Sequence, residues 1–406
     1  MLLLILYTVS TLDAIAFSMV ITIMTPYVVS LGGTQFYLGV LGSTSALIAL
    51  IWNPIVGGLS DNLGRKKVLI QCLLICLVGN LMLTCSSSLT VFFISRILTA
   101  FGTQIMTLLK SLIDDNIPNQ ESKMAAIGRM QALGGFAFIV GALVAGHLSE
   151  YENGYRYIFY LISAIFAVNL SLIWLVPETQ KKKQSQKKTA PSFNVIKELK
   201  SAAVKLTSVD WTKYWDLFVI KLIINFVLNV FQFNINPIMT RRFSTTGKTF
   251  GYIIALSTVL GICGHLSMRR LKTVLYKSDS AGFKRLLHGN LLMIYTCLGL
   301  GLATTFPVYV LHLLPMTISR VLFDNTFTEV ILARASPQEK GSIMGTFEST
   351  SAVGGLTAPL LSGLVSESWG NDMCILLCTV PLIFGTVLTY TQNTKSQKAI
   401  HSSKSQ

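Results

Sequence analysis

The stretch Gly57-Gly58-Leu59-Ser60-Asp61-Asn62-Leu63-Gly64-Arg65-Lys66-Lys67-Val68-Leu69 is a short polar turn between two long apolar runs. Gly64 permits the positive φ of a tight turn, and Gly57 and Gly58 let one helix approach a neighbour closely. Three cations follow the turn directly, so the charge rule for membrane proteins predicts that this side of the membrane is the cytoplasm. Asp61 is expected to be held by a helix N-terminus or by an arginine.

The composition predicts a membrane protein. Of 406 residues, 51% are hydrophobic and 13% are charged, whereas a soluble chain carries about 25% charged residues. The net charge is +15, but the lysines and arginines lie between apolar runs, which indicates membrane orientation and excludes a nucleic-acid partner. The seven cysteines form no CxxC or His/Cys cluster, so we expect no metal site or disulfide framework. Catalytic and nucleotide-binding signatures are absent, and we expect neither enzyme activity nor a cofactor.

Apolar segments of about 20 residues recur along the chain, and this length crosses the hydrocarbon core of a bilayer. They are predicted near residues 2–29, 36–57, 68–84, 89–113, 126–148, 157–176, 217–237, 250–266, 287–304, 309–332, 342–365 and 373–390. The predicted fold is therefore an all-α polytopic membrane protein with twelve transmembrane helices. Residues 1–176 form an N-terminal six-helix half, 177–213 a basic cytoplasmic linker, 214–392 a C-terminal six-helix half and 393–406 a cytoplasmic tail. Both termini are expected in the cytoplasm, with Arg241, Arg242 and Lys248 as the main exception to the charge bias.

The two sets of spans are an internal repeat. Ile94-Ser95-Arg96-Ile97-Leu98 in the fourth span returns as Ile318-Ser319-Arg320-Val321-Leu322 in the tenth. Gly141-Ala142-Leu143-Val144-Ala145-Gly146 in the fifth span matches Ala358-Pro359-Leu360-Leu361-Ser362-Gly363 in the eleventh. Ordered matches in corresponding spans predict two parallel halves of six helices each.

The polar turn resembles the signature loop of the major facilitator superfamily, G-x-L-x-D-x-x-G-R-x-x-x-L, at every fixed position. Pro177-Glu178-Thr179 is similar to the P-E-T that closes the sixth span in this family, and Arg96 is similar to its fourth-span arginine. Leu12-Asp13, with Met24-Thr25-Pro26, resembles the tetracycline-efflux branch. The resemblance implies a substrate site between the halves at mid-membrane, and a secondary transporter of a small organic solute that works by alternating access.

The same resemblance implies that the turn is a conformational latch. Its residues are Gly57, Asp61, Gly64, Arg65 and Lys66. The basic residues 269–285 of the second half are expected not to repeat it, and the fifth span lacks the proline of the family's antiporter signature. These two departures keep open an alternative function, a solute sensor or membrane scaffold of the same fold without net transport.

Polar residues at helical spacing predict a substrate cavity. On the fourth span they share one face with Lys110 and Asp114, and on the seventh they share another. The candidates are Arg96, Thr103, Thr107, Lys221, Asn225, Asn229, Gln232 and Asn236. Hydrogen bonds between neighbouring helices would give the same spacing, so for the seventh span both interpretations stay open.

Three acids are candidates for proton coupling: Asp13, Asp324 and Glu348. Asp13 is favoured, because no cation lies one turn away from it in its own helix. Asp324 has Arg320 one turn before it, so we expect this pair to be structural, with Arg320→Ala destabilising the protein. The expected partners are a small-molecule solute, the lipid bilayer and protons, and the expected oligomeric state is a monomer.

Overall fold

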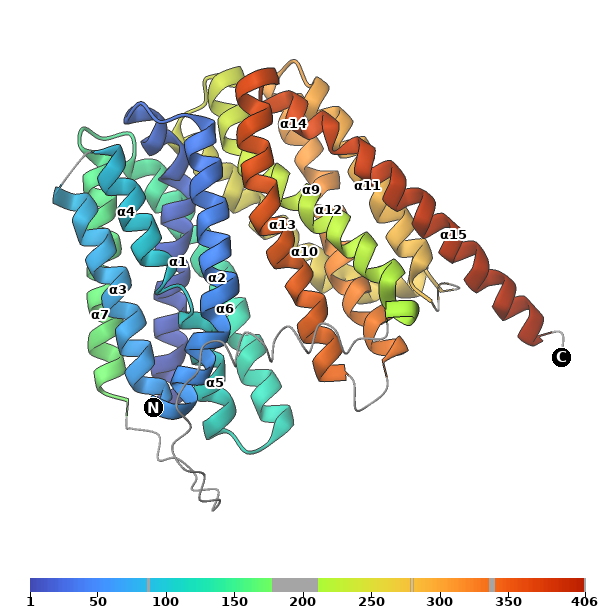
Figure 1. The fold of residues 1–406 in the computed structure, drawn as a ribbon, viewed down its shortest axis with the longest axis horizontal. Helices are drawn as coiled ribbons and strands as arrows, with labels where there is room; N and C mark the ends of the chain where they lie inside the picture. Colours follow the sequence, from blue (N-terminus) through green and yellow to red (C-terminus); the bar gives the residue numbers. More distant parts are fainter. Residues whose placement is uncertain (86–87, 177–210, 278, 280, 336–339, 405–406) are drawn as a thin grey trace. The chain divides into compact units, whose positions relative to one another are not determined.

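The computed structural model describes residues 1–85, 88–176, 211–277, 279, 281–335 and 340–404 (Figure 1). These residues are almost wholly helical and contain no strand. Lipid explains this, since the hydrocarbon core offers no water to backbone groups and each spanning segment must bond its own. The predicted linker lies outside the described residues except for its last three, which begin a helix.

Ten helical segments are long and apolar enough to cross a bilayer. Two of these consist of paired helices, namely α4 (Leu89–Ala100) with α5 (Ile105–Asn116), and α14 (Asn371–Leu377) with α15 (Thr379–Lys404). Two further helices of spanning length, α11 (Phe283–Leu302) and α13 (Lys340–Trp369), bring the described segments to twelve. The all-α fold of twelve spans predicted from the sequence is confirmed.

The chain forms two compact units. Unit 1 comprises Met1–Gly33, Thr44–Val204 and Thr246–Ala255, and unit 2 comprises Thr34–Ser43, Lys205–Thr245 and Leu256–Gln406. Two helices contribute to both units, α2 (Gln35–Leu63) and α10 (Gly247–Leu275).

In unit 1, α1 (Leu2–Ser30) packs along α6 (Gln120–Leu148), and α3 (Arg65–Cys85) packs on α7 (Gly154–Trp174) and on α4. Gly141 allows the first of these contacts, because a Cβ at this position would lie 2.4 Å from the carbonyl oxygen of Ile15. The Ser18 hydroxyl donates to the carbonyl oxygen of Phe138 at 2.6 Å across the same contact. The fifth-span glycine thus has a packing role that does not need the proline of the antiporter signature.

Unit 2 repeats these pairings. The seventh span, α9 (Trp211–Phe243), packs along α13, and α11 packs on α12 (Phe306–Arg334) and on α15. In each set of six spans, the first span therefore packs on the fifth, and the third span packs on both the fourth and the sixth. Gly354 serves the contact of α13 with α9, where an added Cβ would lie 3.2 Å from the backbone of Asn225. The internal repeat of the sequence thus extends to the packing.

Several helices run past the ends predicted from hydropathy. The eighth span was expected to end near residue 266, but α10 continues to Leu275, and α9 begins at Trp211 instead of near 217. The last helix, α15, continues through most of the predicted tail to Lys404. Apolar runs report only the length inside the hydrocarbon core, whereas helical hydrogen bonding continues through the interface, where long charged side chains reach water.

The fourth span is broken, contrary to the single helix expected. Residues 101–104 form a turn between α4 and α5. Gly102 lets this turn lie against α3, because a Cβ there would be 2.7 Å from both the Cys72 carbonyl oxygen and the Cys76 sulfur. The Trp52 indole N–H donates to the carbonyl oxygen of Phe101 at 2.9 Å. A backbone acceptor in the break is thus satisfied inside the protein, as a spanning segment requires.

An ion pair between a buried acid and a partly exposed arginine joins the start of α9 to the end of α12. Arg334 donates from both terminal nitrogens to the carboxylate of Asp216, at 2.8 and 3.0 Å, and its guanidinium lies 5.1 Å from the ring centroid of Phe283. The expected pair of Arg320 and Asp324 is present as well, but its atoms are 3.9 Å apart and both side chains are exposed. An exposed pair contributes little to stability. Strong destabilisation is therefore expected from breaking the pair of Arg334 and Asp216, and not from Arg320→Ala.

We predict that Arg334→Ala lowers the free energy of unfolding by about 3 kcal/mol, because it leaves the Asp216 carboxylate buried without a counter-charge. Arg320→Ala, the matched control, should cost less than about 1 kcal/mol. Thermal unfolding of the purified protein in detergent measures both. Adding Asp216→Asn to Arg334→Ala should restore part of the loss, and equal melting of the two single variants would contradict the prediction.

Candidate functional site

The polar turn of unit 1 is built around Arg65. Gly64 has a φ of +99°, a conformation that favours glycine, and Arg65 begins α3 directly after it. The Arg65 guanidinium contacts the carboxylates of Asp61 at 2.6 Å and Asp115 at 3.2 Å. Asp115 lies at the end of α5, so one cation joins the ends of three helices. The expectation that an arginine holds Asp61 is confirmed.

Lys66 extends this junction to a fourth helix. Its ammonium group donates to the carbonyl oxygens of Trp174 and Val176 at 3.0 and 2.5 Å. A cation at a helix C-terminus binds carbonyl groups that lack helical partners and interacts favourably with the helix dipole. Gly57 was expected to allow close helix contact, but a Cβ there would meet no atom within 4 Å. The expectation was wrong for Gly57.

Unit 2 contains a second turn of the same design, contrary to the expectation for residues 269–285. Asp279 and Gly282 have the same three-residue spacing as Asp61 and Gly64, and Gly282 has a φ of +78°. Backbone N–H groups of Lys284 and Arg285 donate to the Asp279 carboxylate. Three of the family's fixed positions are missing here, which is why the sequence pattern did not reveal it.

Arg285 occupies the place of Arg65 in this second turn. Its guanidinium contacts the carboxylates of Asp279 at 3.0 Å and Glu329 at 2.7 Å, and Lys272 also pairs with Glu329. Glu329 lies near the end of α12, as Asp115 lies near the end of α5. Arg285 is only 1% exposed, against 20% for Arg65. The second network is therefore the more completely shielded from water.

Asp13 of α1 and Arg96 of α4 are ionisable groups inside the spans of unit 1, and Arg96 is buried. The Arg96 guanidinium donates to the Asn80 side-chain oxygen at 2.8 Å, and its Nε has no hydrogen-bond partner. No hydrogen bond or ion pair to the Asp13 carboxylate occurs among the described residues. No ion pair therefore joins the Asp13 carboxylate to the Arg96 guanidinium.

The residues of the polar face predicted for the fourth span lie on two different helices and in the turn between them, and do not form one face. Arg96 is buried in α4, whereas Thr107 and Lys110 are exposed on α5. Thr103, also exposed, lies in the turn between these helices and donates to the carbonyl oxygen of Ala100. Because the turn interrupts the helix, offsets counted along a continuous helix do not apply. The structure therefore does not bring Arg96 onto the face shared by the other candidates.

The polar residues of α9 have different contacts and therefore different roles. Asn225 donates to the Ser351 hydroxyl of α13 at 2.9 Å, and Asn236 is buried and accepts from Thr240 in its own helix. Gln232 is exposed, and Asn229, which is partly exposed, donates to the backbone oxygen of Asn225. Contact between helices therefore explains Asn225, while Asn229 and Gln232 are the members that can line an open path.

Lys221, the first candidate of this face, is buried among aromatic rings. Its ammonium lies 5.4 Å from the ring centroid of Phe327 and 5.1 Å from that of Phe347. Phe218 packs edge-on against Phe347. A cation between aromatic faces is stabilised by their quadrupoles. Apolar aromatic residues carry no polar signal in the sequence, so this surrounding was not predicted.

The polar residues Asn325 and Glu329 of α12 and the candidate Glu348 of α13 are not brought together in one described cluster. Asn325 and Glu329 lie one turn apart on α12 but do not share a partner. The Asn325 amide contacts His265 of α10 at 3.0 Å, while Glu329 binds Arg285. Glu348 belongs to α13, and its side chain lies outside the described part of the chain.

Twelve spanning segments, with an arginine-centred turn in each unit, define a polytopic helical membrane protein. Residues 6–328 match the model of the Major Facilitator Superfamily, and the chain belongs to this family. It is a secondary transporter of a small solute and an integral multi-pass membrane protein. The alternative of a sensor or scaffold without transport is not favoured.

Relatives and solved structures agree with this assignment. The chain is 25% identical to the multidrug resistance protein MdtG of Enterobacter lignolyticus over 93% of its own length and 88% of that protein. It is 22% identical to mouse major facilitator superfamily domain-containing protein 10, over 87% of its own length and 78% of that protein. The solved human organic anion transporter MFSD10 (TETRAN) has a TM-score of 0.66 at 18% identity, covering 95% and 98%. The solved structure of a bacterial homologue of the human lysosomal transporter Spinster, inward-facing and unoccupied, has a TM-score of 0.76 at 15% identity. The match covers 96% of this chain and 95% of that one.

We predict that cysteines placed at Asn229 and Gln232, in a protein without other cysteines, react readily with a hydrophilic maleimide. A cysteine at Val230, which is buried on another face of α9, should react much more slowly, and one at Asn225 at an intermediate rate. Labelling is measured in intact membranes. Equal protection at Val230 and Gln232 would show that this face of α9 does not line water.

Proposed function

We propose that the chain moves an organic solute by alternating access and that Asp13 couples this movement to protons. The observation that carries the coupling is the isolated carboxylate of Asp13, for which the described residues supply no ion pair. A charged side chain within a membrane span is costly unless it is paired or faces water. Taking up a proton removes this cost, and releasing it requires access to water, so protonation and opening of the path become linked.

The proposal of an organic solute rests on the relatives. One is named a multidrug resistance protein, and one solved neighbour is described as an organic anion transporter. The resemblance of Leu12-Asp13 to the tetracycline-efflux branch supports the same proposal. Within that branch, we propose a relationship to the animal major facilitator superfamily domain-containing protein 9, based on the resemblance of Trp215-Asp216-Leu217-Phe218 and of Ala358–Gly363.

We predict that Asp13→Asn abolishes accumulation driven by a pH gradient but leaves exchange of solute across the membrane. The measurement is flux of a fluorescent organic anion and a fluorescent organic cation in proteoliposomes, with and without an imposed gradient. Asp324→Asn is the matched control, because Asp324 is exposed and ion-paired, and it should keep the response. Wild-type flux that ignores the gradient would remove Asp13 from coupling and favour a uniporter.

The latch function is proposed for both turns. The contacts of Arg65 with Asp61 and Asp115 tie α3 to the ends of α2 and α5, and Arg285 ties α11 to α12 in the same way. Such ion pairs have two discrete states, formed and broken, and can therefore hold helix ends in one arrangement until the cycle separates them.

We predict that Asp61→Asn reduces transport up to about fivefold while protein level and membrane insertion stay normal, because losing one largely exposed ion pair removes up to about 1 kcal/mol from the latched state. Asp114→Asn is the control, since Asp114 is an equally exposed acid that pairs with Lys123 instead of Arg65. Proteoliposome flux and surface labelling measure the two quantities. Full transport by Asp61→Asn would exclude the latch from the mechanism.

The proposed orientation has both termini in the cytoplasm. Arg242 and Lys248, two of the cations that oppose the charge bias, have acidic partners within their own units, and these partners support the proposed orientation. Arg242 contacts Asp372 at 3.1 Å, and Lys248 lies 4.0 Å from Glu150. Paired cations carry less of the orienting charge than the basic residues that follow the two turns.

A further inference from the structure

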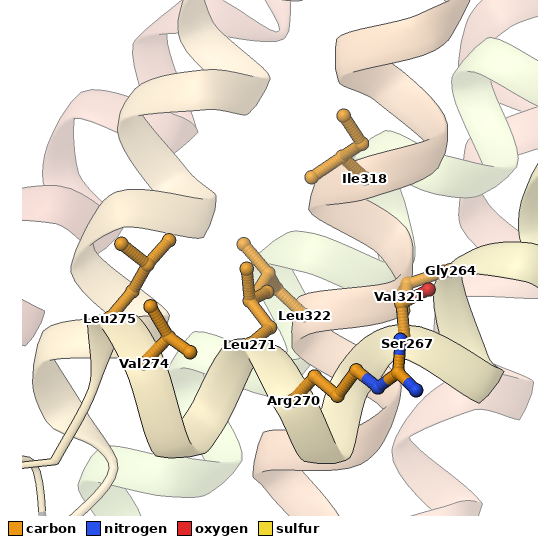
Figure 2. Close-up of a pocket in the computed structure, with 9 residues that line it drawn as sticks. All are labelled: Gly264, Ser267, Arg270, Leu271, Val274, Leu275, Ile318, Val321 and Leu322. Carbon is orange, nitrogen blue, oxygen red and sulfur yellow. The ribbon is translucent and has the colours of Figure 1, made fainter.

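A pocket of about 490 Å³ lies between α10 and α12 in unit 2 (Figure 2). It is lined by Gly264, Ser267, Arg270, Leu271, Val274 and Leu275 of α10 and by Ile318, Val321 and Leu322 of α12. Its volume falls within the range of roughly 300–1,000 Å³ that is typical of small-molecule sites. None of the candidates for the substrate cavity lines it.

The pocket has a polar end and an apolar end. Ser267 and Arg270 lie together near Val321, while Val274 and Leu275 lie at the opposite end (Figure 2). Apart from Ser267 and Arg270, every side chain of the lining is a hydrocarbon. The wall itself is almost wholly hydrocarbon, and the polar groups of Ser267 and Arg270, both exposed residues, stand at one end of it. This arrangement fits a ligand with a hydrocarbon body and one polar end.

Arg270 has no carboxylate partner among the described residues, although α12 carries two acids. Asp324 pairs with Arg320 at 3.9 Å, and Glu329 is held by Arg285 and Lys272. Both acids are therefore engaged elsewhere. The guanidinium of Arg270 keeps its full charge and its hydrogen-bond donors for an external anion.

The walls of the pocket are held in place by contacts between the two helices. The Asn325 amide contacts the His265 ring at 3.0 Å, and Lys272 pairs with Glu329 about two turns further along α10. Gly264 brings the backbone of α10 close to Val321, since a Cβ there would lie 3.0 Å from its methyl group. A site with fixed walls needs less ordering when a ligand binds.

We propose that this pocket binds an apolar organic monoanion. A carboxylate or sulfonate group contacts the guanidinium of Arg270 and the hydroxyl of Ser267, and the hydrocarbon body lies along Leu271, Val274 and Leu275. The planar guanidinium favours such anions, because it can donate two parallel hydrogen bonds to one group. The proposal concerns binding alone and does not depend on transport or on Asp13.

The test is photolabelling of the purified full-length protein with 4-benzoylbenzoate, an aromatic carboxylate whose ketone inserts into nearby C–H bonds under ultraviolet light. The matched neutral probe is 4-benzoylbenzamide. Adducts are mapped by mass spectrometry of peptides covering residues 264–275 and 318–322. The wild-type protein should incorporate the carboxylate in these peptides about tenfold more than the amide at equal concentration, which is the effect of one ionic hydrogen bond.

Two pairs of variants control for loss of folding. Arg270→Gln should reduce carboxylate labelling to the level of the amide, whereas Arg269→Gln, at an exposed neighbour outside the pocket, should not. Val274→Trp should fill the pocket and block both probes, whereas Leu266→Trp, at an exposed position on the same helix, should not. Equal labelling by the two probes in the wild type, or equal labelling of Arg270→Gln and Arg269→Gln, would overturn the proposal. Flux is assayed separately, so failure of the pocket and failure of transport are distinguishable.

Discussion

Charge neutralisation at the ends of the membrane helices is the constraint on which this structure depends. In each unit an arginine follows a glycine with positive φ and contacts two acids from different helices. Without those acids Arg285 would be a fully buried, unpaired cation, and such a charge is strongly destabilising. The same contacts determine which helix ends lie together, so electrostatics and helix packing are satisfied by one set of residues.

The two turns show how a repeated design can differ in strength. Arg65 and its acids are partly exposed, so water and salt weaken their attraction. Arg285 and Asp279 are almost completely buried, and Asp279 also accepts two backbone N–H groups at the start of α11. The exposed turn is therefore the easier of the two to open. A cycle that must break such contacts meets the lower barrier in the unit that carries the complete family signature.

Hydropathy predicted the twelve spans, and the polar turn offered an arginine or a helix N-terminus as the partner of Asp61, because these features depend on residues close together in the sequence. The second turn was missed, because only Asp279, Gly282 and Leu287 repeat fixed positions of the signature, and Glu329, which contacts Arg285, is 44 residues away from it. The break in the fourth span was missed for a related reason. Gly102 matters there because Cys72 and Cys76 pack against it, and no periodicity records a contact between helices.

Polar residues within spans have two uses that leave the same periodicity in the sequence, and only their contacts separate them. Asn225 has its amide on Ser351 of a neighbouring helix, while Gln232, two turns further along the same face, is exposed. A hydrogen bond between helices holds a bundle together, whereas an exposed amide can exchange water for solute. Lys221 illustrates a third outcome, in which aromatic rings surround the charge. Exposure combined with polarity, and not polarity alone, is therefore the property that nominates a residue of α9 for contact with the solute.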